Sequence, residues 1–147
     1  MKKSNNKGFS LVELIVVVAI MAVLVGVLAP AYLRYVEKSR LQKDVSAIGE
    51  VVAACEVAMA EEDVYKTVST TAAKITLTKA GTTTISGADG SLEAEVALTI
   101  PSVTLSSTKI TANVDIDVAV TSGVVSVTVS GGGSDADWAK ALVELNK

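Results

Sequence analysis

One carboxylate in this chain stands at the start of a long apolar run, where a charge is costly. Glu13 follows a short leader with three lysines, and residues 14–33 include no charged side chain. An ionised carboxylate within a membrane-type helix costs roughly 2.5 to 3.5 kcal/mol on insertion scales. Such a group needs a cation beside it, so the chemistry expected of Glu13 is ion pairing and not catalysis.

The remaining polar residues form no catalytic pattern. The chain has no histidine, which removes His-dependent triads and His-ligated zinc. Asp115 and Asp117 point to one side of an expected strand, where a solvated face explains them better than a calcium site does. Asp135 and Asp137 favour a helix N-terminus electrostatically. The sequence therefore predicts no enzyme, no cofactor and no metal site.

Cysteine chemistry is also limited, because Cys55 is the one cysteine of the chain. An intramolecular disulfide is impossible, and Cys55 falls on an apolar helical stripe. We expect a small buried hydrophobic residue there and not a reactive thiol.

Residues 14–33 are long enough to span a membrane as a helix. An ordinary secretory signal peptide is one interpretation of this segment, with the lysines as its basic region. Three features oppose it: the run is longer than a usual signal core, no small-x-small cleavage site follows, and Glu13 lies where such cores are uncharged.

The residues Lys7-Gly8-Phe9-Ser10-Leu11-Val12-Glu13 resemble the class III signal of type IV prepilins and related pseudopilins. The resemblance implies that a membrane peptidase cuts between Gly8 and Phe9 and methylates the new N-terminus at Phe9. It also implies that Glu13, then the fifth residue, acts in filament assembly together with Phe9. Pro30 falls where many pilins have a proline, and it predicts a kink or a segment that melts on assembly.

The same resemblance implies the partners of the chain. They are further copies in a helical homo-oligomeric filament, the prepilin peptidase/methyltransferase, the pilus assembly platform with its ATPase machinery, and the cytoplasmic membrane before assembly. The lysine-rich leader predicts a single pass with the N-terminus inside, and a cell-surface filament after assembly. With a net charge of −3 the chain offers no reason to predict nucleic-acid binding.

The expected fold is α+β and pilin-like, with a leader at 1–8, a long helix at 9–63 and a head domain at 64–147. The membrane-spanning part of the helix is about 14–33. Beyond it, apolar residues recur every three or four positions and predict a face that packs on a sheet: Leu41, Val45, Ile48, Val52, Cys55 and Met59. Charged residues are expected on the other sides: Lys38, Arg40, Lys43, Asp44 and Glu50. The acidic run 61–63 is expected to mark the helix end.

After Val64 the composition favours strands of an antiparallel sheet that the long helix covers on one face. Alternating apolar residues predict strands at 92–100 and 110–120, and Ser122-Gly123 predicts a hairpin to a strand through Val125, Val127 and Val129. Lys79-Ala80-Gly81 suggests a second hairpin, between 75–78 and 82–86.

The glycine run 131–133 is expected to be a flexible break before a short C-terminal helix. Ser134 is the expected cap of that helix, and Trp138, Leu142 and Leu145 share one of its sides.

Three functions are compatible with these features, and we favour a structural subunit of a type IV pilus. A pseudopilin of a type II secretion or competence system would share the N-terminal motif. However, the calcium loop of major secretion pseudopilins and the cysteine pair of the competence type are not recognisable. The third is a single-pass membrane-anchored binding module, which would not need processing at Gly8.

Overall fold

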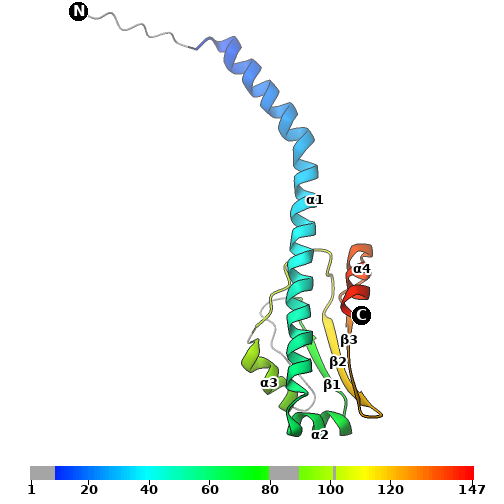
Figure 1. Ribbon diagram of the computed structural model, residues 1–147. Helices are drawn as coiled ribbons and strands as arrows, with labels where there is room; N and C mark the ends of the chain where they lie inside the picture. Colours follow the sequence, from blue (N-terminus) through cyan, green and yellow to red (C-terminus); the bar gives the residue numbers. More distant parts are fainter. Residues whose placement is uncertain (1–8, 80–89, 101) are drawn as a thin grey trace, which may run out of the picture. The chain divides into compact units, whose positions relative to one another are not determined.

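The longest element is helix α1, Leu11–Ala58, which runs without interruption through Pro30 (Figure 1). The computed structural model describes residues 9–79, 90–100 and 102–147. It has two units, one reaching from the N-terminus to Val36 and the other from Glu37 to Lys147. The described part of the first unit is essentially α1, whereas the second unit combines the rest of α1 with all the strands. The expected α+β, pilin-like architecture is therefore confirmed.

The sheet of the second unit has three antiparallel strands in the order β1-β2-β3. These are β1, Ala73–Leu77, β2, Val114–Thr121, and β3, Val124–Gly131. Their register places Ile75 opposite Ile116 and Ile116 opposite Val129, so alternate residues of each strand face the core. The hairpin predicted at Ser122-Gly123 connects β2 to β3 and is confirmed.

Three short helices surround this sheet: α2, Glu62–Thr70, α3, Ser91–Thr99, and α4, Ala136–Leu145. Helix α4 packs on β3, as Figure 1 shows, with Trp138 fully buried. Asn146 then exchanges two hydrogen bonds with the backbone of Val129, at 2.6 and 2.8 Å. The predicted apolar side of the C-terminal helix is thus confirmed.

The end of the long helix differs from the expectation of one helix to residue 63. Helix α1 ends at Ala58, where Ala60 and Glu61 donate backbone hydrogen bonds only three residues back. A new helix, α2, then begins at Glu62. The acidic run opens α2, where negative charge is favourable, and does not close α1, where it would be unfavourable.

The strand predicted at 92–100 is wrong, because this segment forms helix α3. Leu92 and Val96, four residues apart, are its buried residues, whereas Leu98 is 79% exposed. Alternation and helical spacing both include Leu92 and Val96, so the pattern alone did not separate the two periods. Glutamate, alanine and leucine in this segment favour helix.

The ends of the strands also differ from the predicted ones. Strand β2 begins at Val114 instead of 110, because Thr111 and Ala112 donate to the carbonyl of Gly132 before the ladder starts. Strand β1 pairs with β2 along its whole length. The hairpin suggested at Lys79-Ala80-Gly81 and its second strand at 82–86 lie outside the described residues.

The glycine run 131–133 is a tightly packed turn, so the prediction of a flexible break is wrong. All three glycines have positive φ, between 77° and 101°. A Cβ on Gly132 would come within 2.2 Å of Nε1 of Trp138, and that Nε1 donates to the carbonyl of Gly131 at 2.8 Å. The cap of α4 is Asp135 and not Ser134, since the Asp135 carboxylate accepts from the N–H groups of Asp137 and Trp138.

Candidate assembly site

The two residues that the sequence links to assembly lie at the beginning of α1. Phe9 is 87% exposed and precedes the helix, while Gly8, the residue before the expected cut, lies outside the described residues. Glu13 is also exposed and lies in the first turn. The structure therefore places Phe9 and Glu13 close together in the chain, on a surface that another molecule can reach.

Glu13 and Ser10 form a reciprocal pair of hydrogen bonds that caps the helix. The N–H of Ser10 donates to Oε2 of Glu13 at 2.8 Å, and the N–H of Glu13 donates to Oγ of Ser10 at 3.2 Å. This is a capping box, in which a serine and a glutamate three residues later bond each other's backbone. The Ser-x-x-Glu spacing indicates such a box, whereas the prediction for Glu13 rested on the charge of its side chain and on the resemblance of the motif.

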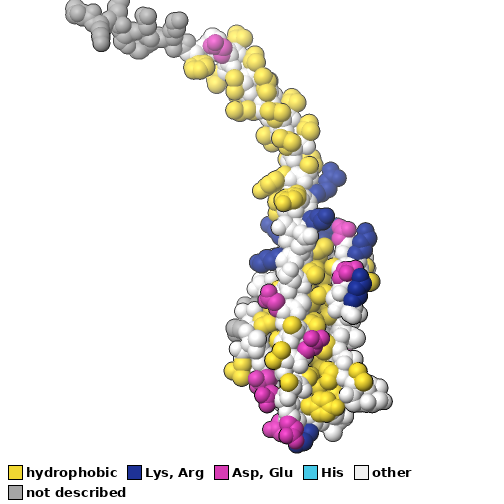
Figure 2. All heavy atoms as spheres, viewed as in Figure 1, with side chains coloured by type: hydrophobic (Ala, Val, Ile, Leu, Met, Phe, Trp, Pro, Cys, Tyr) yellow, Lys and Arg dark blue, Asp and Glu magenta, His cyan; other side chains and the backbone are white. Residues whose placement is uncertain are grey.

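The side chains from Phe9 to Tyr35 are all exposed in this single chain. Most are large and apolar, and α1 is long and apolar enough to cross a membrane. Exposing an apolar surface of this length to water is unfavourable, so we expect lipid or other apolar helices to cover it. Figure 2 shows these hydrophobic side chains along the first part of α1.

Pro30 lies inside this exposed segment and weakens its backbone bonding. A proline has no N–H, so the carbonyl of Gly26, one turn earlier, loses its usual helical donor. The carbonyl of Pro30 itself accepts from Nε of Arg34 at 3.3 Å. Pro30 and Gly26 therefore mark the part of α1 with the least backbone support.

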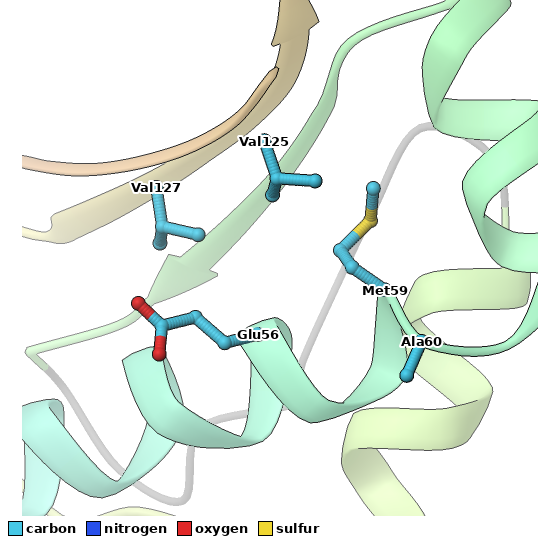
Figure 3. A pocket seen from close by; sticks show the side chains of 5 residues that line it. All are labelled: Glu56, Met59, Ala60, Val125 and Val127. Atoms are coloured by element: carbon cyan, nitrogen blue, oxygen red, sulfur yellow. The ribbon is translucent and has the colours of Figure 1, made fainter. Parts of the chain in front are cut away.

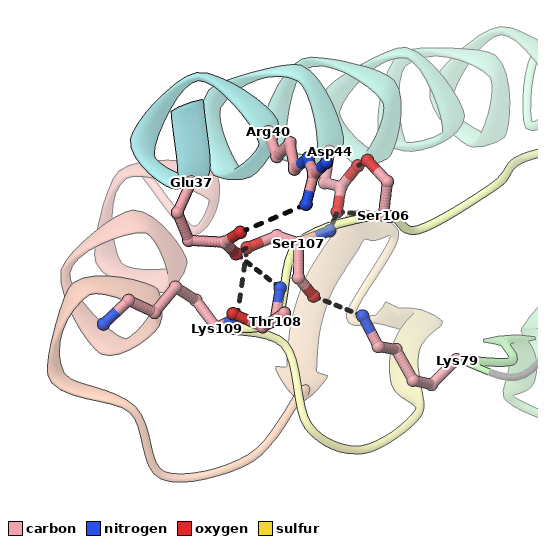
Figure 4. Close-up of polar contacts among 8 residues, drawn as sticks. All are labelled: Glu37, Arg40, Asp44, Lys79, Ser106, Ser107, Thr108 and Lys109. Carbon is pink, nitrogen blue, oxygen red and sulfur yellow. Dashed lines mark hydrogen bonds and ion pairs between the residues drawn. The ribbon is translucent and has the colours of Figure 1, made fainter. Parts of the chain in front are cut away.

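A second polar feature, which the sequence pattern did not predict, ties α1 to the segment before β2. Asp44 was expected on the charged outer side of the helix but is fully buried. Its carboxylate accepts from the N–H of Ser106 at 2.8 Å, from Oγ of Ser106 at 3.0 Å and from the N–H of Ser107 at 2.7 Å (Figure 4). Three donors satisfy this buried carboxylate, which makes its burial tolerable.

Glu37 continues the same attachment two turns earlier in α1. Its Oε1 accepts from Oγ of Ser107 at 2.8 Å and from the N–H of Thr108 (Figure 4). Nζ of Lys79 donates to the carbonyl of Ser107 from the other side. Glu37 and Asp44 together hold residues 106–108 against the helix.

The pKa of Glu37 makes this attachment sensitive to acid. Partial burial raises the pKa of its carboxyl, but the hydrogen bonds from Ser107 and Thr108 outweigh this and leave the pKa below its ordinary value of 4.5. A group with a lowered pKa in the folded state stabilises the fold above its unfolded pKa, and this stabilisation is lost as the pH falls through the folded pKa.

We expect the free energy of unfolding to decrease as the pH falls below about 4.5, and to decrease less in Glu37→Gln than in the wild type. Denaturant titrations of the detergent-solubilised chain at several pH values, followed by Trp138 fluorescence, measure the free energy of unfolding of both proteins. Glu50→Gln, an exposed site on α1, is the control. If the free energy of unfolding depends on pH in the same way in Glu37→Gln and in the wild type, the assignment to Glu37 is contradicted.

The four aspartates considered in the sequence, Asp115, Asp117, Asp135 and Asp137, contact lysines. Nζ of Lys74 lies 3.4 Å from Asp115 and 3.2 Å from Asp117, across the β1-β2 pair. Nζ of Lys109 likewise lies 3.1 Å from Asp135 and 3.5 Å from Asp137. Within the described residues no group of three His, Cys, Asp or Glu side chains is arranged to hold a metal ion.

Cys55 is fully buried in the core, as expected from its position on the apolar stripe. Burial raises the pKa of its thiol to about 12, and the nearby Glu56 carboxylate adds to this. Because the thiolate is the reactive form, Cys55 is an inert packing residue.

Comparison with known proteins extends the N-terminal observations. The family model described as prokaryotic N-terminal methylation motif matches residues 3–29. A type IV major fimbrial protein FimA of Dichelobacter nodosus is 37% identical over 57 residues, which are 39% of this chain and 36% of that protein. Another FimA of the same organism is 39% identical over 54 residues, or 37% and 35% of the two chains.

The chain thus spans a little over a third of the length of these curated relatives. No solved structure matches it. The family model covers the motif that carries Phe9 and Glu13. A long apolar helix and an antiparallel sheet are the elements expected of a pilin. The methylation motif at residues 3–29 and the fimbrial proteins matched over about two fifths of the chain support a relationship of this chain to the type IV pilin family.

Proposed function

We propose that this chain is the structural subunit of a type IV pilus, cut after Gly8, methylated at Phe9 and polymerised through the first part of α1. The observation that carries the proposal is the exposed, charge-free surface of residues 14–33, which directly follows Glu13 in the sequence. Before assembly this surface suits the hydrocarbon of a membrane. After assembly the same surface suits the helices of neighbouring subunits, with Gly26 allowing close approach.

In this proposal Glu13 fixes the axial register between neighbouring helices, because apolar surfaces alone do not define one position of a helix along another. Cutting at Gly8 would create an α-amino group on Phe9, four residues before Glu13. The carboxylate of an arriving subunit then pairs with the amine of a subunit already in the filament. A single charged contact in an apolar interface fixes register, as a buried polar residue does in a coiled coil. The fimbrial names of the relatives favour a pilus over a secretion pseudopilus.

The direct test is the N-terminal residue, and its mass, in filaments sheared from the native cell. We expect a methylated Phe9 in the wild type. Gly8→Lys is expected to leave an uncut precursor in the membrane and none in the sheared fraction, because the peptidase would meet a bulky charged side chain at the cut. Matured protein from Gly8→Lys would mean that the cut lies elsewhere. An intact Met1 in wild-type filaments would mean that the chain is not cut.

A further inference from the structure

The exposed charges along the second unit's part of α1 are separated by sign. Lys38, Arg40 and Lys43 form a basic stretch, and all three are exposed. Further along α1, Glu50 and Glu56 are exposed and acidic. Among the described residues, Lys38, Lys43, Glu50 and Glu56 make no ion pair, whereas Arg40 has a 3.7 Å contact with Glu37.

A groove lies beside Glu56, between the end of α1 and strand β3. It has a volume of about 310 Å³ and is lined by Glu56, Met59, Ala60, Val125 and Val127. Figure 3 shows the Glu56 carboxylate extending toward Val127 across this Glu56 groove. Val57, which follows Glu56 on α1, is 70% exposed.

The composition of the groove restricts what can bind there. It offers apolar side chains and one carboxylate, without the several converging polar groups that orient a small-molecule ligand. A long cationic side chain fits this combination, because its methylene stem can lie on valine and methionine while its charged end meets Glu56. The basic stretch carries such side chains, and two of them, Lys38 and Lys43, are exposed and make no ion pair among the described residues.

We propose that the Glu56 groove of one subunit receives the basic stretch of α1 of a neighbouring subunit. The contact rests on the proposed filament function and deepens it by naming a head-domain interface. Two grooves facing each other would bring Glu56 against Glu56, which like charge disfavours. A contact between two different surfaces of the same chain instead propagates from copy to copy and builds an open filament.

Cross-linking tests the contact without disturbing its charges. Gln42, beside Lys43, and Ala60, in the groove, are both exposed. Filaments of the double variant Gln42→Cys/Ala60→Cys, treated with a short bismaleimide, are expected to give a ladder of covalent oligomers, while each single variant gives none. Cys55 does not interfere, because its thiol is buried. The matched control, Gln42→Cys/Thr128→Cys, places the second thiol on an exposed residue of β3 that does not line the groove and is expected to give no ladder.

Charge exchange tests the energetics of the same contact. Glu56→Lys and Lys43→Glu are each expected to lower filament yield about fivefold or more, the effect of an exposed ion pair at the upper end of its range. The double exchange restores the attraction within every subunit pair and is expected to recover most of the yield. Glu144→Lys, an exposed glutamate of α4 outside the groove, is the control and should polymerise like wild type.

The outcomes separate this inference from the proposed function. Intact filaments without a cross-linked ladder, or with normal yield from Glu56→Lys, would overturn the head-domain contact alone. Loss of yield in Lys43→Glu that the double exchange does not recover would assign the basic stretch to another partner, such as anionic lipid headgroups. A wild type that forms no sheared filament would overturn the proposed function, and this contact with it.

Discussion

Replacing Glu13 by glutamine is expected to leave the subunit in the membrane and largely outside the filament. Glutamine keeps the size of the side chain and can still serve at this position of a capping box with Ser10. It removes the negative charge that would pair with the amine of Phe9 in a neighbour. Removing one partner of a buried ion pair costs about 3 to 5 kcal/mol, so incorporation should fall by at least about tenfold.

The measurement is the ratio of variant to wild-type subunits in sheared filaments and in membranes of cells that express both. Ser10→Ala is the matched control, because it breaks the hydrogen bond that Oγ of Ser10 accepts from the N–H of Glu13 and keeps the carboxylate. Loss of a cap costs about 1 kcal/mol of local helix stability, and we expect near-normal incorporation. If Ser10→Ala is excluded and Glu13→Gln enters filaments freely, Glu13 acts by capping α1 and not by its charge.

Local signals in the sequence were sufficient for the elements that depend on neighbouring residues. The charge-free run at 14–33 defined the first part of α1, and the Ser122-Gly123 turn defined the β2-β3 hairpin, where both residues have positive φ. Trp138 and the residues one turn apart from it defined the buried side of α4. These features need no information about distant parts of the chain.

Features that depend on distant residues were missed or misplaced. Residues 106–108 approach Asp44 across more than 60 positions of sequence, and nothing near Asp44 indicates them. A signal was nevertheless present, because Asp44 lies three residues after Leu41 and four before Ile48, on the face we assigned to the core. The glycine run was misinterpreted for a similar reason, because Asn113 and Thr111, which lie much earlier in the sequence, pack against Gly131 and Gly133.

Removing the buried carboxylate in Asp44→Ala is expected to destabilise the second unit by about 3 to 5 kcal/mol. The substitution leaves the N–H groups of Ser106 and Ser107 without their acceptor, and an unsatisfied buried donor, here the N–H of Ser107, costs about 1 to 3 kcal/mol. The lost bonds to a charged acceptor are also stronger than neutral ones. Packing suffers further, because Asp44 lies between Leu41 and Ile48 on the buried face of α1.

Denaturant unfolding of the detergent-solubilised chain measures this loss, because Trp138 is the one tryptophan and is buried in the second unit. Glu50→Ala is the control on the same helix, where an exposed substitution should change the free energy of unfolding by about 0.5 kcal/mol or less. A similarly small effect of Asp44→Ala would mean that residues 106–108 do not depend on this carboxylate. The expected result instead means that α1, which would carry the subunit into a filament, also holds its head domain together through one buried acid.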